Sequence, residues 1–588
     1  MSETVQAGLP AWFRKTSIMR IQFGILWIAA VPLVASPPSP VADAAMKGDR
    51  AMVRSLIAKK ADVNAPQGDG ATAIQWAAYH DDLEMANILI AAGADPKAAS
   101  REGATALSLA SESGSAAMIE RLLKAGADPN QKSRNGETPL QFVARSGRID
   151  AMKVLLDHKA DVNARESLRG TTALIWAAEQ GHADAVKFLI ERGANVNAVS
   201  NPDSKGGTAY LAPPIQARLR SEQGAGGLRA NRSRPAASAA EDLVANADAA
   251  AAAQAFGRSQ NTDGGGLSAL VYAAREGSLE TVRALVEAGA DVNLPTHYGW
   301  TPLLTATQNR NYRIGEYLLA NGANPNIANQ GGWTPLYIAT DNRNIEGGDY
   351  PVRAPDIDHL EYIKLLLNKG ADVNARVCGA KSTATQCVGD STETRTIFTM
   401  QWVYEDGATP FWRAAQSGDT ALMKLLLDKG ANPKIATAHG VTPLAVASGI
   451  GWVEGITFEW SEKENLEAVK LCLDLNIDPN IADDEGRTAL HGAAHKGRNE
   501  VIKLLVAHGA KLDAHDLGSR DTVNGAMLGL TWIPLHYSQG LVRVGVQSAI
   551  AHPETEALLR DLMQQQGIPI PANITSSICL TKGANGCQ

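Results

Sequence analysis

Short apolar runs with helical spacing recur along this chain in pairs, and a turn follows each pair. In the unit that spans residues 103–137, a first run ends at Gly114 and a second ends at Gly126. The apolar positions of the two runs are Leu107, Leu109 and Ala110, and then Met118, Ile119, Leu122 and Leu123. Spacing of this kind places the apolar side chains on one helix face, and glycine is a common stop signal. The pattern therefore predicts two helices per unit.

The unit returns with a period of 33 residues. A Thr or Ser, here called the anchor, precedes each first helix at positions 72, 105, 138, 172, 268, 301, 334, 409, 442 and 488. Its hydroxyl can cap the helix, and in several units proline follows at the first helical position, where no N–H is needed. The phrase T-P-L-x-x-A-A, a leucine-rich run and G-A-D-x-N fill one period. In period and phrase the chain resembles ankyrin-repeat proteins.

The resemblance implies an all-α solenoid of ankyrin repeats. We count twelve repeats, including an N-terminal unit at residues 41–64 and a degenerate last unit that begins near Ile533. One such unit cannot bury its apolar face alone, so neighbouring units must stack. Repeat arrays are binding scaffolds whose partner is determined by surface residues, so the resemblance implies a protein partner and leaves its identity open.

Irregular steps between the anchors predict insertions after repeats 5, 8 and 11 and within repeats 8, 10 and 12. The largest, residues 201–266, is rich in Ala, Gly, Ser and Arg, which is typical of disorder. A solvated linker and a basic loop that docks an acidic partner are its two interpretations. The insertion separates repeats 1–5 in residues 39–200 from repeats 6–12 in residues 267–570, and residues 571–588 form a tail.

The N-terminus resembles a targeting segment. Arg14, Lys15 and Arg20 precede an apolar run from Ile21 to Ala35, and a Pro-rich stretch follows. This order predicts a secretory signal peptide with its linker in residues 1–38, and a retained membrane anchor is the alternative. We therefore expect a secreted or periplasmic protein that has no membrane span after cleavage.

The cysteines fit an oxidising compartment. Cys378 and Cys387 lie close together in one inserted loop, and Cys579 and Cys587 lie close together near the C-terminus. We expect two local disulfides, with free thiols or metal binding as alternatives; the spacing lacks the paired pattern of zinc sites. Cys472 stands alone in an apolar helix, where we expect it to be buried and inert.

Composition and motifs narrow the function. The net charge is -7 with both signs interspersed, which gives no basic surface for nucleic acid. No phosphate-binding, dinucleotide or nucleophile-elbow motif occurs, and His491 and His495 lack the glutamate of a zinc-protease helix. We expect no catalytic site, no metal, no cofactor, and a monomer. The alternatives are an enzyme with its site on the insertions, an accessory subunit of an envelope enzyme, or a structural spacer.

Aromatic residues gather in the later repeats. Two tryptophans stand just before the anchor in repeats 7 and 8, a position that we expect to face the concave groove. Two further aromatics replace the usual polar residue three positions after the anchor, and two more lie in a β-like insertion. Because exposed aromatics anchor many interfaces, we predict contact with a partner. The six residues are Trp300, Trp333, Tyr337, Trp412, Trp402 and Tyr404.

Packing, rather than contact with a partner, is the other role that we consider for the tryptophans. Trp300 and Trp333 could instead pack beneath the insertions. Trp76 and Trp176 precede the two small residues of the repeat phrase, and we expect both in the core.

Overall fold

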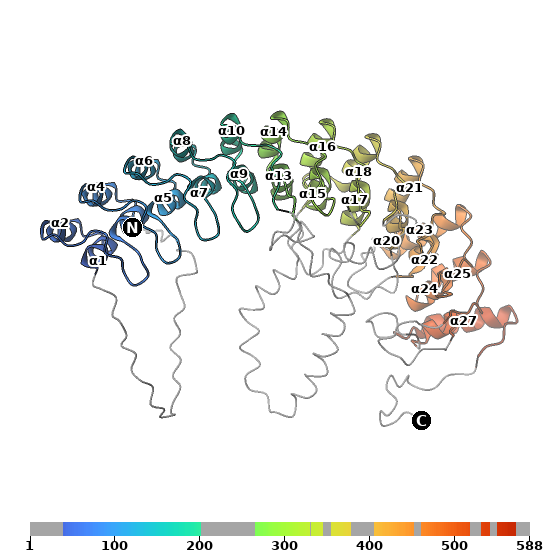
Figure 1. Ribbon diagram of the computed structural model, residues 1–588. Helices are drawn as coiled ribbons and strands as arrows, with labels where there is room; N and C mark the ends of the chain where they lie inside the picture. Colours follow the sequence, from blue (N-terminus) through green and yellow to red (C-terminus); the bar gives the residue numbers. More distant parts are fainter. Residues whose placement is uncertain are drawn as a thin grey trace, which may run out of the picture.

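The computed structural model describes residues 39–201, 265–329, 331–344, 354–377, 405–451, 460–517, 531–540, 542 and 550–571. Within these ranges it holds 24 helices, which alternate between an inner and an outer row of one arch (Figure 1). The same ranges contain no strand, only isolated bridges between Ala99 and Thr105 and between Val199 and Ser268. The predicted all-α solenoid is confirmed.

The inner helices line the concave side of the arch (Figure 1). They are α1 (Pro40–Met46), α3 (Ala73–Tyr79), α5 (Ala106–Ser113), α7 (Pro139–Ser146), α9 (Ala173–Glu179), α13 (Ala269–Glu276), α15 (Pro302–Gln308), α17 (Pro335–Arg343), α20 (Pro410–Ser417), α22 (Pro443–Ser448), α24 (Ala489–His495) and α26 (Pro534–Ser538).

The outer helices form the convex side (Figure 1). They are α2 (Arg50–Ala58), α4 (Leu83–Ala91), α6 (Ala116–Lys124), α8 (Ile149–Asp157), α10 (Ala183–Glu191), α14 (Leu279–Glu287), α16 (Tyr312–Ala320), α18 (His359–Asn368), α21 (Thr420–Asp428), α23 (Glu462–Asp474), α25 (Asn499–Ala507) and α27 (Pro553–Gln565). In the part of the chain that the structure describes, no helix has the length and apolar character needed to cross a membrane.

The ends of the inner helices follow from the repeat phrase. The Thr105 side chain accepts a hydrogen bond from the N–H of Ser108 at 3.0 Å, which satisfies one of the free donors at the start of α5. Gly114 ends the same helix with a φ of 71°, a left-handed conformation that a residue without Cβ adopts at little cost. The predicted anchor and stop are both confirmed in this unit.

The core lies between neighbouring units. Each inner helix packs against the next, as α3 does against α5 and α7 against α9. Small side chains such as Ala77 and Ala78 are fully buried there and let the backbones approach closely. Leucines of the outer helices, such as Leu89 and Leu155, fill the space behind them. Each unit thus buries its apolar face only against its neighbours.

An asparagine after most of the outer helices links successive turns. Asn64 Nδ2 donates to the carbonyl oxygen of Gly93 at 3.0 Å, and its Oδ1 accepts from the N–H of Asp95 at 2.8 Å. The link also spans the largest insertion, where the N–H of Asp291 donates to Asn197 Oδ1 at 2.9 Å. Because α9 packs against α13 and α10 against α14, the stack is continuous across that insertion.

Where the structure describes it, the loop between an outer helix and the next inner helix, here called the finger, hangs beneath the concave side (Figure 1). Neighbouring fingers are joined through their backbones: the N–H of Arg101 donates to the carbonyl oxygen of Asp69 at 2.9 Å. The N–H of His297 makes the equivalent bond to Gly265 at 2.9 Å. The fingers and the inner helices therefore form one connected surface.

The contact between α17 and α20 contains a network of buried charged side chains. Arg413 Nε lies 2.8 Å from Asp341 Oδ1, and both side chains are at most 3% exposed. Arg343 Nε lies 2.7 Å from Asp419 Oδ2 nearby. Arg413 also donates to the carbonyl oxygen of Asn344 at 2.6 Å. Buried charges are tolerated only when they are paired and hydrogen-bonded in this way.

Candidate functional site

The inner helices present two positions to the concave side, three residues apart and so on one helix face. We call the first the inner column. From α1 to α13 it holds Asp43, Trp76, Leu109, Phe142, Trp176 and Tyr272. We call the second the rim column. It holds Met46, Tyr79, Glu112, Arg145, Glu179 and Arg275.

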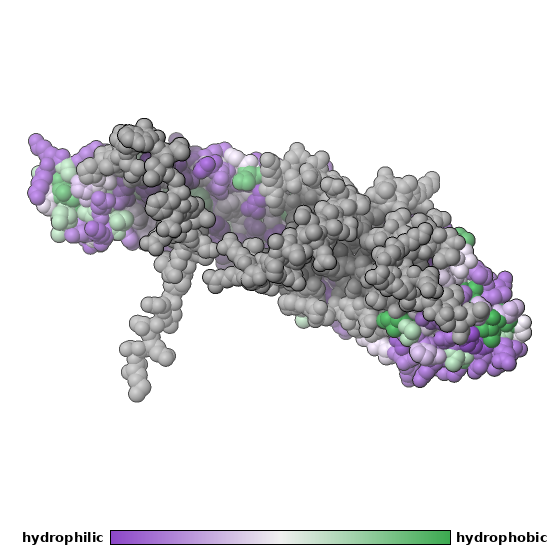
Figure 2. All heavy atoms as spheres, turned by 90° about the horizontal axis from the view of Figure 1, so that it is seen from below, coloured by the Kyte–Doolittle hydropathy of each residue, from purple (hydrophilic) through white to green (hydrophobic). Residues whose placement is uncertain are grey.

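Contacts with the fingers fix the side that the inner column faces. Trp76 Nε1 donates to Oε1 of Gln67, in the finger of the same repeat, at 2.7 Å. Trp176 Nε1 donates to Thr171 Oγ1, at the base of its own finger, at 2.7 Å. Both indoles therefore lie in the angle between finger and inner helix. Figure 2 views this side, and over the N-terminal repeats at the left small hydrophobic areas lie among hydrophilic ones.

Aromatic rings follow one another along the inner column. The rings of Phe142 and Trp176 meet edge to face, with centroids 6.2 Å apart. Phe142 is half-buried, whereas Trp176 is buried. Trp176 was expected in the core, which is confirmed. The same expectation holds only in part for Trp76, which packs against the core but is half-buried.

The most exposed aromatic cluster lies at the N-terminal end. The ring of Tyr79 meets that of Trp76 at 5.8 Å between centroids, and His80 stacks on Trp76 at 6.1 Å. The Tyr79 side chain is 50% exposed and that of the adjacent Met46 is 39% exposed. A clustered apolar surface of this kind on a rigid element is typical of a binding site.

Charged side chains accompany the rings in the rim column. The Arg145 guanidinium lies 5.5 Å from the centroid of Trp176, and that of Arg275 lies 4.9 Å from Tyr272. Arg275 is also paired with Glu179 at 3.3 Å. Burial raises the pKa of Glu112 above its ordinary value, although Arg145 partly offsets this. The concave side thus combines aromatic surface with carboxylates and guanidinium groups.

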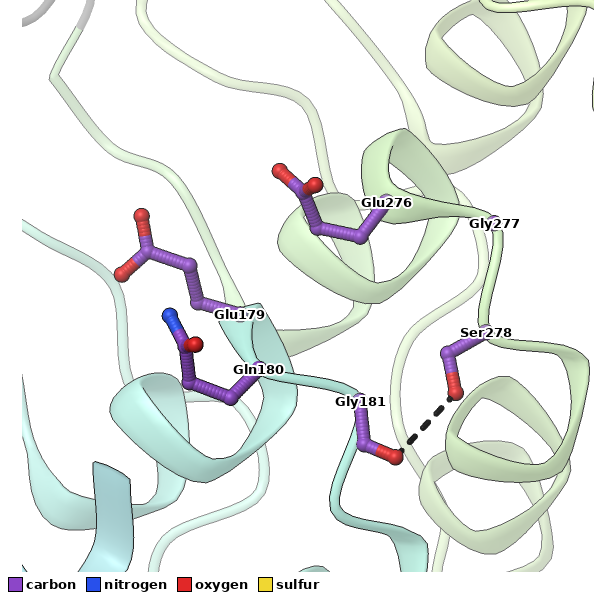
Figure 3. A pocket seen from close by; sticks show the side chains of 6 residues that line it. All are labelled: Glu179, Gln180, Gly181, Glu276, Gly277 and Ser278. Atoms are coloured by element: carbon purple, nitrogen blue, oxygen red, sulfur yellow. Dashed lines mark hydrogen bonds between the residues drawn. The ribbon is translucent and has the colours of Figure 1, made fainter. Parts of the chain in front are cut away.

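A shallow hollow interrupts the concave side between repeats 5 and 6. It is lined by the ends of α9 and α13, and Figure 3 labels all six residues: Glu179, Gln180, Gly181, Glu276, Gly277 and Ser278. Ser278 Oγ donates to the carbonyl oxygen of Gly181 at 3.4 Å across its floor. The lining is polar and offers hydrogen-bonding groups to a partner that bridges the two repeats.

The structure buries four of the six predicted contact residues. Trp300 is 3% exposed, Trp333 is 2% exposed, and Tyr337 and Trp412 are fully buried. Their predicted exposure is therefore wrong, and packing is the interpretation that the structure supports. Trp333 and Tyr337 do lie together, with ring centroids 5.2 Å apart.

The burial of Trp412 has a physical cause. The position three residues after the anchor points at the next repeat rather than into the groove. There, Gln75 Nε2 donates to the carbonyl oxygen of Ala104 at 2.5 Å, and Gln141 Nε2 donates to that of Thr171 at 2.7 Å. Trp412 Nε1 makes the equivalent bond to Val441 at 3.0 Å. This column is a link between repeats, so an aromatic residue in it is not a contact residue.

Sequence reasoning missed Tyr79 and Glu112, although a signal was present. The rim column changes from methionine to tyrosine, glutamate and arginine between successive repeats. Positions that pack in the core, such as Ala77 and Ala110, keep small or apolar side chains instead. A fixed place in the repeat phrase that holds charged side chains of both signs, as this column does with Glu112 and Arg145, indicates a surface position.

Other predictions lie wholly outside the described residues. They are the contact residues Trp402 and Tyr404, the disulfides Cys378–Cys387 and Cys579–Cys587, and the leader in residues 1–38. Cys472 is described, fully buried and free, and burial raises the pKa of its thiol to about 12. Burial also lowers the pKa of His491 and His495 to about 4. Within the described ranges, no three His, Cys, Asp or Glu side chains gather in a metal-binding arrangement.

The chain shows similarity to characterised proteins over its repeats. Among curated proteins, it is 33% identical over 105 residues to the ankyrin repeat, SAM and basic leucine zipper domain-containing protein 1 of Dasypus novemcinctus, covering 18% of this chain and 20% of that protein. It is 28% identical over 183 residues to a putative ankyrin repeat protein of Fowlpox virus, covering 27% of this chain and 31% of that protein. The chain thus spans about a fifth to a third of the length of these relatives.

Family models give the broader match. The model of three ankyrin repeats matches residues 41–133, 115–200, 236–329, 270–377 and 459–538, and the single-repeat model matches residues 406–438. These segments together cover well over half of the chain and coincide with the stacked helix pairs. The chain belongs to the ankyrin-repeat family.

Proposed function

We propose that this chain is a non-catalytic scaffold that captures a protein partner on the concave side of its arch, outside the cytoplasm. Ankyrin repeats are protein–protein interaction modules, and the chain is a scaffold of that kind. The compartment and the use of the concave side are the further steps of the proposal. The apolar leader sequence and the closely spaced cysteine pairs support a compartment outside the cytoplasm.

One observation supports the concave side above the others. From α1 to α9, exposed or half-exposed Met46, Trp76, Tyr79 and Phe142 lie on rigid inner helices. Interfaces derive most of their binding energy from a few aromatic and arginine side chains, and side chains on packed helices lose little further freedom on binding. The buried aromatics of repeats 7 to 9 take no part in this proposal.

Site-specific photo-crosslinking tests the placement. A photoreactive phenylalanine analogue would replace Tyr79 or Phe142 on the concave side, in the full chain and in its native compartment. The matched control positions are Leu83 and Ile149 on outer helices, which are 37% and 36% exposed. We expect both concave positions to crosslink to the same protein and the outer positions not to do so. Equal crosslinking from both sides would show that the concave placement is wrong.

A further inference from the structure

We propose that the N-terminal end of the concave side binds a basic segment of the partner. Arginine or lysine side chains of that segment would lie over Trp76 and Tyr79 and against the carboxylates of Asp43, Asp69 and Glu112. This inference rests on the proposed function and adds the chemistry of the partner to it.

The first step is the orientation of the aromatic cluster. Asp43 Oδ1 accepts from Gln67 Nε2 at 2.7 Å, and Gln67 Oε1 accepts from Trp76 Nε1 at 2.7 Å. This chain of bonds holds the indole in place and satisfies its only donor. Tyr79 stands almost perpendicular to it, at 83° between the ring planes. His80 and the core cover part of the Trp76 ring, so the half-exposed Tyr79 ring offers most of the surface that an apolar or cationic group could contact.

The second step is the charge around the cluster. Two acidic groups at the start of the outer helix α4 are paired: Arg50 Nε lies 2.8 Å from Asp82 Oδ2, and Arg54 lies 2.8 Å from Glu84. In the described part of the chain, Asp43, Asp69 and Glu112 on the concave side have no ion-pair partner. Three unpaired carboxylates beside exposed rings favour a cation and disfavour an acidic or purely apolar occupant.

The third step weighs the cations already on this side. They are Lys47 at the end of α1, Arg101 in the finger of the third repeat and Arg145 on α7. Arg145 lies over Trp176, further along the groove, and in the described residues none of these three cations makes an ion pair with the three acids. Partial burial raises the pKa of Glu112, and the nearby Arg145 only partly offsets this. A guanidinium of the partner would relieve that cost.

Arginine fits these groups better than other side chains. Its planar guanidinium stacks on an aromatic face and at the same time donates two parallel hydrogen bonds to a carboxylate. Attraction between a cation and an aromatic ring contributes about 0.5–1 kcal/mol at an exposed site and more when water is excluded. Trp76, Tyr79 and Asp43 provide both kinds of partner within one repeat of each other.

Synthetic peptides test the proposal directly. One short peptide carries several arginines in a glycine–serine background, and the other carries glutamate at the same places. Calorimetric titration into the full chain, at low and at high salt, measures both affinities. We expect the arginine peptide to bind, the glutamate peptide not to bind, and Tyr79→Ser or Trp76→Ala to weaken arginine-peptide binding roughly three- to tenfold. Asp43→Asn and Glu112→Gln should weaken it as well.

The matched control is Glu84→Gln, which removes the same charge from the convex side and should leave the affinity unchanged. Tyr79→Ser guards against misfolding, because the Tyr79 side chain is half exposed, whereas Trp76 packs partly against the core. Equal affinities for wild type, Tyr79→Ser and Glu112→Gln would overturn the inference, as would equal binding of the glutamate peptide. Concave crosslinks without arginine-peptide binding would leave the proposed function standing and remove this inference alone.

Discussion

At the residue scale, one position of the repeat phrase shows how different side chains perform the same task. Gln75, Gln141, Trp412 and His491 all lie three residues after an anchor, and each links its helix to the carbonyl oxygen of the next repeat. His491 Nδ1 also accepts from the N–H of Thr488 at 3.0 Å. The glutamine side chain can both accept and donate at any pH, whereas the histidine must stay neutral to do so.

This difference predicts a pH effect on stability. Burial lowers the pKa of His491 from 6.5 to about 4, so the folded state holds the neutral form. Its contribution is fully present above about pH 6.5 and is lost as the pH falls toward 4, because the unfolded chain takes up the proton first. We expect His491→Gln to keep both hydrogen bonds. Between pH 7 and pH 4 this variant should lose less unfolding free energy than the wild type, by on the order of 3 kcal/mol.

Denaturant unfolding between pH 7 and pH 4 would measure the effect. The control is His508→Gln, which replaces an exposed histidine directly after α25 in the same repeat. Its unfolding free energy should depend on pH as that of the wild type does. If His491→Gln lost as much unfolding free energy between pH 7 and pH 4 as the wild type, His491 would not be buried as a neutral group.

The same scale explains why the predicted contact residues failed. The sequence identified which residues vary from the repeat phrase, but variation alone does not tell whether a position faces the groove or the next repeat. Trp300 and Trp412 were interpreted as groove residues, yet both are buried. Trp76 was assigned to the core, yet its ring edge is open because Asp43 and Gln67 hold it at the surface.

At the element scale, helix limits were predictable because local chemistry determines them. An anchor threonine, a proline at the first helical position and a terminal glycine act within a few residues of the helix that they limit. The polar contact between α17 and α20 was not predictable in this way. Asp341 and Arg413 lie 72 residues apart, and each has an ordinary place on its own helix.

The α17–α20 contact gives a stability prediction. Removing one partner, as in Arg413→Ala, takes away the guanidinium that lies 2.8 Å from the buried Asp341 carboxylate and should cost about 3–5 kcal/mol of unfolding free energy. Replacing both, as in Asp341→Leu with Arg413→Met, should cost less than either single change, since no unpaired charge remains. Chemical denaturation of the wild type, of Arg413→Ala, of Asp341→Leu and of the double variant measures these differences.

The exposed pair of Arg50 with Asp82 and Glu84 provides the comparison. Arg50→Ala should change the unfolding free energy much less than Arg413→Ala does, because solvent screens surface pairs. If Arg413→Ala were equally mild, the buried network would not hold the two helices together.

At the scale of the whole molecule, the repeat period was enough to predict a stacked all-helical arch, since each unit can bury its apolar face only against another. The curvature and the chemistry of the concave side were not accessible, because they depend on how each column turns toward its neighbours. The continuity of the stack past residues 202–264 likewise emerged only from the structure, through the packing of α9 against α13 and the bond between Asp291 and Asn197.

The proposed compartment also belongs to this scale. Full-length chain expressed in a bacterium should be recovered from the periplasm or medium with a mass that lacks the leader. Leu26→Arg places a charge in the apolar run and should keep the leader uncleaved and the chain inside the cell. A membrane-bound chain of full mass would identify an anchor instead, and a full-mass cytosolic chain would contradict secretion.

The asparagine links have a consequence for how such a chain changes over generations. Asn64, Asn130 and Asn163 make the same pair of bonds to the unit that follows them. If one whole unit were lost or duplicated, the asparagine of one unit would therefore still meet the backbone groups that it bonds in the next unit. A partial unit has no matching end, so extra residues are accommodated only where they leave these joints intact, as between Asn197 and Asp291. The fold thus permits change in whole steps along its axis and confines all other growth in length to its loops.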